Sequence, residues 1–159
     1  MEYRIGQGYD VHALAEGLPM WLGGVQIPSK TGFVAHSDGD VAIHALCDAL
    51  LGALALGDIG HLFPDTDDRW KDVDSKELLA AVLDLPEYRS WTVVNADITI
   101  ALQAPKLAFH IDEMRETLSA VMGISPARVS IKATTTERLG FVGRGEGCEV
   151  WAVVLIARK

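Results

Sequence analysis

The longest apolar stretch of the chain runs from Val41 to Leu56 and reads VAIHALCDALLGALAL. It is shorter than the roughly 20 residues that a membrane-spanning helix needs. Three residues also interrupt it, namely His44, Asp48 and Gly52. The stretch therefore predicts a helix that is buried in a globular domain, and nothing in the chain predicts a membrane partner.

Segments on both sides of this stretch predict the other elements of one α/β domain covering residues 1–159. The central helix would begin at HSDGD, capped by Ser37 or Asp38, and end at Gly57. Further helices are expected at Ser75–Leu85 and Lys106–Gly123, and strands at Met1–Tyr9, Met20–Pro28 (bent at Gly23 and Gly24), Trp91–Leu102, RVSIKATT and CEVWAVVLIA. His61–Asp74 is expected to be a surface loop. The order β-β-α-α-β-α-β-β indicates a two-layer α/β sandwich, in which helices cover one face of a mixed sheet.

The charge and the cysteines of the chain limit which partners and which cellular location we expect. The chain has 159 residues and a formal net charge of −8, and no cluster of Lys and Arg could follow a nucleic-acid backbone. Any phosphate that it binds must therefore meet local donors or a metal. Cys47 and Cys148 stand far apart, and the first residues lack the pattern of a secretory signal. A cytoplasmic protein is expected, or a plastid protein if a transit peptide has been removed.

The segment GYDVHAL places Asp10 and His12 two residues apart after a glycine. On a strand these side chains point to the same face, roughly 6 to 7 Å apart along it. Together with His44 they would form a set of two imidazoles and one carboxylate that suits Zn²⁺ and leaves a fourth position open. Asp48, four residues after His44, is the predicted partner that orients its ring. The alternative is a core histidine beside a strand edge that binds no metal.

Two further segments could bind phosphate. His36 and Ser37 precede the expected helix, where free N–H groups favour anions, although a simple cap would look the same. In KATTTERLGFVGRGEG a strand leads Lys132, three threonines, Glu137 and Arg144 into a glycine-rich turn. The alternative is a purely structural hairpin. The chain contains no G-x-x-x-x-G-K-[ST], G-x-G-x-x-G or G-x-S-x-G pattern, so common nucleotide-binding and serine-hydrolase folds lose support.

Taken together, six motifs resemble the 2-C-methyl-D-erythritol 2,4-cyclodiphosphate synthase family of the non-mevalonate isoprenoid pathway. They are RIGQGYDVHAL, GGVQIP, AHSDGDVAIHALCDALLGALALGDIG, LFPDTD, QAPK and KATTTERLGFVGRGEG. The resemblance implies a homotrimer with its sheets towards the three-fold axis and with active sites between subunits. It also implies a lyase reaction that converts 4-diphosphocytidyl-2-C-methyl-D-erythritol 2-phosphate into the cyclic diphosphate and CMP.

The resemblance further implies a role for each matching residue. Asp10, His12 and His44 would bind Zn²⁺, and Glu137 would bind a second ion, Mg²⁺ or Mn²⁺, on the diphosphate. His36 and Thr135 would stabilise the transition state. The remaining matches are substrate contacts: Val11, Ser37, Asp58, Ile59, Gly60, Phe63, Pro64, Asp65, Thr66, Asp67, Leu102, Gln103, Ala104, Pro105, Lys106, Leu107, Ala108, Ala133, Thr134, Thr136, Phe141 and Arg144.

The chain departs from the family pattern at Gln7 and His61, neither of which is a ligand position. The segment after Gly147 is also shorter than in some relatives, which concerns the shape of the axial cavity. Two other functions remain open. A zinc-dependent phosphohydrolase would use the same three ligands to activate water. A non-catalytic trimer would bind an isoprenoid diphosphate in its axial cavity through Arg144.

Overall fold

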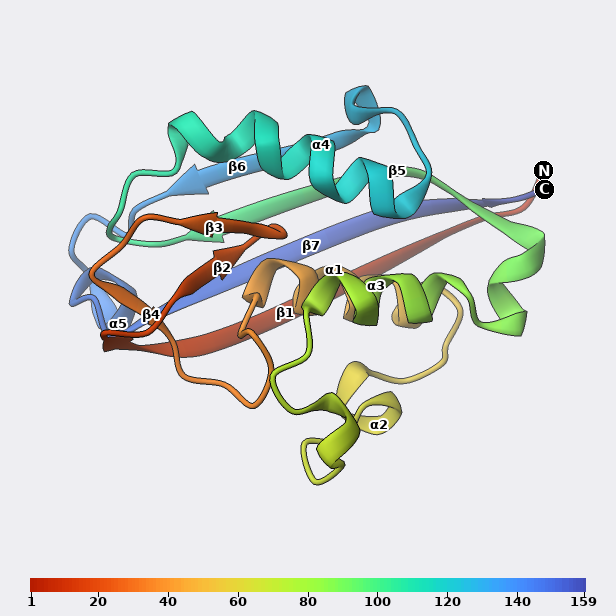
Figure 1. Ribbon diagram of the computed structural model, residues 1–159. Helices are drawn as coiled ribbons and strands as arrows, with labels where there is room; N and C mark the ends of the chain where they lie inside the picture. Colours follow the sequence, from red (N-terminus) through yellow and green to blue (C-terminus); the bar gives the residue numbers. More distant parts are fainter.

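The structure, a computed structural model, describes all residues from 1 to 159. A five-stranded sheet forms one layer, and the helices lie over one of its faces (Figure 1). The strand order is β4-β1-β7-β5-β6, with β1 at Tyr3–Glu16, β4 at Thr31–Phe33, β5 at Trp91–Ala101, β6 at Val129–Thr134 and β7 at Gly147–Arg158. Only β5 and β6 pair in parallel. The predicted layer sandwich with a mixed sheet is therefore confirmed.

Three helices have more than two turns: α1 (Val41–Ala53), α3 (Ser75–Leu83) and α4 (Ile111–Met122). Helices α1 and α4 pack on the sheet, and α3 packs against these two helices. Two short helices, α2 (Ile59–Leu62) and α5 (Gly140–Gly143), lie in connections. Single 3-10 turns occupy Asp68–Trp70, Pro86–Ser90, Ala108–His110 and Pro126–Arg128. No helix combines the length and the apolar composition that crossing a bilayer requires.

Helix α1 is the centre of the core. Every residue of α1 except Asp48 and Gly52 is buried, which explains why the stretch is apolar on nearly all sides. Gly6 and Gly8 of β1 allow this helix to lie directly on the sheet. A Cβ atom on Gly8 would stand 1.9 Å from the carbonyl oxygen of Ala45, so only glycine fits there. The close packing fixes the distance between β1 and α1, and with it the site described below.

The start of α1 differs from the prediction. The capping residue is Asp40, whose carboxylate accepts from the N–H of Ile43, and the helix ends at Ala53 and not at Gly57. The same carboxylate accepts from the N–H groups of Gly23 and Gly24. Asp40, and not Ser37 or Asp38, caps the helix because its carboxylate accepts from three buried N–H groups at once. Burial raises the pKa of this carboxyl.

Other boundaries are also corrected. The predicted bent strand at Met20–Pro28 is a separate hairpin of β2 (Met20–Leu22) and β3 (Val25–Ile27), because Gly23 and Gly24 both have positive φ and reverse the chain. The first strand runs on to Glu16, β4 was not predicted, and α4 begins at Ile111 after a 3-10 turn. The segment His61–Asp74 is largely loop, but it contains a 3-10 turn and packs Phe63 and Trp70 against the core.

Candidate metal centre and ligand pockets

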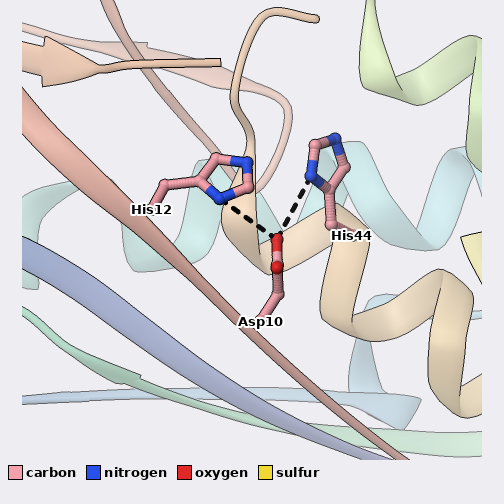
Figure 2. A group of neighbouring side chains, drawn as sticks. All are labelled: Asp10, His12 and His44. Carbon is pink, nitrogen blue, oxygen red and sulfur yellow. Dashed lines mark hydrogen bonds and ion pairs between the residues drawn. The ribbon is translucent and has the colours of Figure 1, made fainter. Parts of the chain in front are cut away.

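Asp10, His12 and His44 converge on one point, as Figure 2 shows. Asp10 and His12 alternate with exposed neighbours on β1, so they continue the face that Gly6 and Gly8 turn towards α1, which carries His44. The Asp10 Oδ2 atom lies 3.2 Å from His44 Nδ1 and 3.6 Å from His12 Nδ1. One ligand atom from each residue lies within 4.8 Å of the others.

This donor set fits a divalent cation. One carboxylate oxygen and two imidazole nitrogens are the ligand types that suit Zn²⁺ and several other transition metals. His44 is buried, while Asp10 and His12 are half-buried, so the cluster is open to a ligand on one side. The predicted convergence of strand and helix is thus confirmed, and the cluster is a candidate site for a divalent metal.

The metal cluster lies in the wall of a cavity of about 440 Å³. Nine of the expected site residues line this first pocket: Asp10, His12, His36, Ser37, His44, Ile59, Gly60, Phe63 and Asp65. Four lining residues were not predicted, namely Ala35, Trp70, Val73 and Leu78. Their apolar side chains carry no chemical signal in the sequence. Trp70 packs here against Phe63, with ring centroids 4.8 Å apart.

His36 has an unpaired polar atom at this pocket. Its Nε2 atom is buried and has no hydrogen-bond partner within the chain. A buried polar group without a partner costs free energy, so such groups are rare unless a ligand or water completes them. The arrangement leaves one nitrogen of His36 available beside the candidate metal site.

Asp48 does not orient His44. Its Oδ1 atom accepts from the backbone N–H of Ile59 at 2.8 Å, which holds the start of α2 against α1. His44 instead directs Nε2 towards the hydroxyls of Ser75, at 3.0 Å, and Ser37, at 3.2 Å. The i, i+4 spacing predicted the wrong partner because the helix places Asp48 beside the α2 segment. Burial raises the pKa of Asp48.

A second pocket of about 310 Å³ collects the other main group of expected residues. It lies at the ends of β5 and β6 and is lined by Leu102, Gln103, Pro105, Lys106, Leu107, Ala108, Ile111, Ala133, Thr134 and Thr135. Of these only Ile111 was not predicted. Ala104 and Arg144 lie instead in a third hollow, together with Lys30 and Gly143.

The two pockets are separate within one chain, and no residue lines both of them. Asp10 on β1 and Ala133 on β6 lie in one row of paired residues that crosses the sheet. Val150 on β7 and Ile100 on β5 lie between them in this row. Three strand spacings correspond to about 14 Å. The β2–β3 hairpin also intervenes, since it contacts Asp40 at the start of α1 and lies against α4.

Several expected site residues lie outside both pockets. The Val11 side chain points to the opposite face of β1, and its carbonyl oxygen faces His12 Nδ1 at 2.6 Å. Asp58 caps α2 and Asp67 caps a 3-10 turn. The others lie on neighbouring surface: Pro64, Thr66, Thr136, Glu137 and Phe141. Glu137 is exposed and has a φ of 53°, in the turn after β6, away from the Asp10 cluster.

Comparison with known proteins places this geometry in a family. The YgbB family model matches residues 3–157. The 2-C-methyl-D-erythritol 2,4-cyclodiphosphate synthase of Alcanivorax borkumensis is 60% identical over 153 residues, covering 96% of each chain. The homologous synthase of Methylococcus capsulatus is 57% identical over 157 residues, covering 99% of each chain.

Solved structures agree with these relatives. A 2C-methyl-D-erythritol-2,4-cyclodiphosphate synthase in a CDP-bound form superposes with a TM-score of 0.89 at 43% identity, and the match covers 97% of this chain and 100% of that one. The bifunctional IspDF from Campylobacter jejuni superposes with a TM-score of 0.94 at 43% identity, and the match covers 99% of this chain but only 43% of that longer one. The motifs, the fold and these matches agree, and the chain belongs to the YgbB family of 2-C-methyl-D-erythritol 2,4-cyclodiphosphate synthases.

Proposed function

We propose that this chain converts 4-diphosphocytidyl-2-C-methyl-D-erythritol 2-phosphate into 2-C-methyl-D-erythritol 2,4-cyclodiphosphate and releases CMP, as a lyase of the non-mevalonate isoprenoid pathway. The observation that carries the proposal is the Asp10–His12–His44 cluster in the wall of the first pocket, in a chain that belongs to this family.

We propose Zn²⁺ as the metal of this cluster. Asp10, His12 and His44 would hold it through one oxygen and two nitrogens, a set that leaves room for a substrate oxygen in a tetrahedral site. When bound, the ion supplies Lewis-acid polarisation of a phosphate group. Glu137 would hold the second ion, Mg²⁺ or Mn²⁺; its exposed carboxylate is free of any ion pair in the chain, which supports this role.

The chemistry requires no nucleophile from the protein. The 2-phosphate oxygen of the substrate attacks the β-phosphorus, the bond to the α-phosphate oxygen breaks, and CMP leaves. A phosphate monoester is already largely ionised near neutral pH because its second pKa is about 6. The chain must therefore position the two phosphates and stabilise charge on the phosphoryl oxygens. We assign this task to His36, whose Nε2 is unpaired beside the metal cluster, and to Thr135.

The second pocket would receive the cytidine end of the substrate. A solved relative has been described in a CDP-bound form, which supports a cytidine diphosphate site in this fold. In this chain the pocket offers apolar walls from Leu102 and Leu107, with Lys106 and the hydroxyls of Thr134 and Thr135 as polar groups. Apolar walls with a few polar groups are typical of small-molecule sites.

We further propose that the chain acts as a homotrimer in which the first pocket of one subunit faces the second pocket of its neighbour. The separation of the two pockets within one chain supports this arrangement. The uncovered face of the sheet supports the orientation towards a three-fold axis, because it carries exposed apolar side chains: Ile5, Tyr9, Val11, Trp151 and Val153. Two buried, unpaired cysteines support a reducing, cytoplasmic location.

Phosphorus NMR of the purified protein with the substrate, Zn²⁺ and Mg²⁺ tests the proposal. A cyclic diphosphate that accumulates in step with CMP is the expected result. CMP with a linear phosphate product would identify a phosphohydrolase and overturn the synthase assignment. Absence of turnover, combined with saturable binding of an isoprenoid diphosphate, would favour the non-catalytic trimer.

A further inference from the structure

A buried chain of polar groups lies behind the candidate metal ligand His44. The Ser75 Oγ atom lies 3.0 Å from His44 Nε2, on the side of the ring away from Asp10. The same hydroxyl contacts Asp38 Oδ1 at 2.5 Å, and the backbone N–H of Ser75 donates to Asp38 Oδ2 at 2.9 Å. Ser75 is fully buried, although it stands at the first position of α3. The function described above uses neither Asp38 nor Ser75.

The direction of each hydrogen bond follows from the groups involved. A carboxylate only accepts, so the hydroxyl proton of Ser75 is donated to Asp38. The Ser75 oxygen then has only lone pairs to offer to His44, which means that His44 must carry a proton on Nε2. The other ring nitrogen, Nδ1, faces Asp10 Oδ2 at 3.2 Å, and a cation bound between them would take the place of a proton there. Ser37 Oγ, 3.2 Å from the same nitrogen, already accepts from the N–H of Gly39 and can serve as a further acceptor.

His12 has the complementary arrangement. Its Nδ1 atom lies 2.6 Å from the carbonyl oxygen of Val11, which can only accept, so the proton of this ring is on Nδ1. The unprotonated nitrogen is then Nε2 of His12. In a neutral imidazole the nitrogen without a proton is the one that can bind a cation, and the partner of the other nitrogen decides which it is.

We propose that Asp38 and Ser75 are positioning residues that hold the neutral His44 ring in its Nε2-protonated tautomer, with the Nδ1 lone pair directed at the cation. This inference rests on the metal site of the proposed function. Asp38 acts through Ser75, because accepting the hydroxyl proton prevents Ser75 from donating it to the ring. Without Asp38 the hydroxyl is free to donate to Nε2, which would move the ring proton to Nδ1 and block the ligand atom.

The first test is the tautomer of His44 in the full-length wild-type protein loaded with Zn²⁺ alone, because without a cation the Asp10 carboxylate, 3.2 Å from Nδ1, would itself favour a proton on that nitrogen. Long-range proton–nitrogen correlation NMR on protein with ¹⁵N-labelled histidine, in mildly alkaline buffer, reports which ring nitrogen is protonated. We expect Nε2 for His44 and Nδ1 for His12. A His44 ring protonated on Nδ1 would overturn the proposal without any variant.

The second test uses Ser75→Ala and Asp38→Ala, with Zn²⁺ alone as the probe in competition with a chelator. Ser75→Ala removes the acceptor and should give a mixture of tautomers, whereas Asp38→Ala should shift His44 towards Nδ1–H. Loss of such an outer partner weakens metal binding by roughly 10- to 100-fold. The matched control is Ser119→Ala, because Ser119 is also buried and helical but donates to the Glu116 carbonyl.

The outcomes separate this inference from the proposed function. Wild-type affinity and an unchanged His44 tautomer in both folded variants would overturn the inference. An equal loss of Zn²⁺ affinity in Ser119→Ala would also overturn it, because the effect would then be one of general packing. A wild-type protein that binds Zn²⁺ with the expected tautomer but forms no cyclic product would refute the proposed reaction alone.

Discussion

Asp48 of α1 accepts a hydrogen bond from the backbone N–H of Ile59 at the start of α2, over 2.8 Å. The helix that carries His44 therefore also holds the segment whose residues Ile59 and Gly60 line the first pocket. Helix α1 therefore supports both the metal cluster and one wall of the first pocket. A substitution of Asp48 should change the position of this wall but not the binding of the metal.

Asp48→Ala tests this division. The variant should raise the KM for the substrate, since α2 loses its anchor, and should lower the free energy of unfolding by about 1 kcal/mol. Its Zn²⁺ affinity should equal that of the wild type, because His44 contacts other groups. A fall in affinity of roughly 10- to 100-fold would instead return Asp48 to the role of a ring-orienting partner.

The raised pKa of Asp48 predicts a pH dependence of stability. Burial is its largest cause, so the folded protein retains the proton above the ordinary value of 3.8, where the unfolded chain releases it. In that window the folded state binds more protons, and stability falls as pH rises. Asp48→Asn keeps an oxygen acceptor for Ile59 but removes the titration. Urea unfolding of the metal-free proteins should show wild type losing stability relative to Asp48→Asn as pH rises from 3.8, and parallel curves would contradict this cause.

The contact between β1 and α1 predicts the effect of a single methyl group. Gly8→Ala would place a Cβ atom 1.9 Å from the Ala45 carbonyl oxygen, so strand and helix must separate. We expect a loss of about 3 kcal/mol in unfolding free energy, at the upper end of the cost of overpacking, and weaker Zn²⁺ binding, since Asp10 and His12 move with the strand. Gly52→Ala on α1 is the matched control, because its Cβ would meet only Gln7 oxygen at 3.8 Å. That variant should gain roughly 0.5 to 1 kcal/mol, and equal losses in both would refute the close-packing argument.

Removal of one ligand should separate metal binding from folding. His44→Ala should lose Zn²⁺ binding and turnover together while its circular dichroism spectrum stays that of the wild type. The control variant His110→Ala should retain both Zn²⁺ binding and turnover. His110 stands in a 3-10 turn outside both pockets. Metal analysis by mass spectrometry after gel filtration checks the prediction. Turnover by metal-free His44→Ala would exclude a role for this cluster in the reaction.

The proposed composite site predicts complementation between two inactive variants. His44→Ala removes a residue of the first pocket, and Thr135→Ala removes one of the second. If sites form between subunits, co-expressed chains that mix at random restore both intact halves at about a quarter of the interfaces, with a corresponding return of activity. Activity no greater than that of either variant alone would show that each site is built within one chain.

The elements that the sequence predicted correctly have a strong local signal. The β-branched run after Trp91 predicts β5 to within one residue, and the apolar period before Gly123 predicts the body and the end of α4, although not its start at Ile111, because residues close in the chain determine them. The boundaries that were wrong depend on distant partners. Asp40 became the cap of α1 because it also meets the N–H groups of Gly23 and Gly24, and a short strand such as β4 exists only by pairing with β1.

The candidate site divides in the same way. The alternation of a strand is enough to place Asp10 and His12 on one face, and residue type is enough to indicate a metal. The sequence by itself thus determined the ligand types, the two-layer fold and the family to which the motifs belong. The tertiary structure confirmed that His44 joins this pair, and it alone decided that Ser75 and not Asp48 lies behind the His44 ring and that two pockets form apart. These relations depend on the packing of α1 against the sheet and of α3 against α1, and such long-range contacts leave no pattern in the spacing of neighbouring residues.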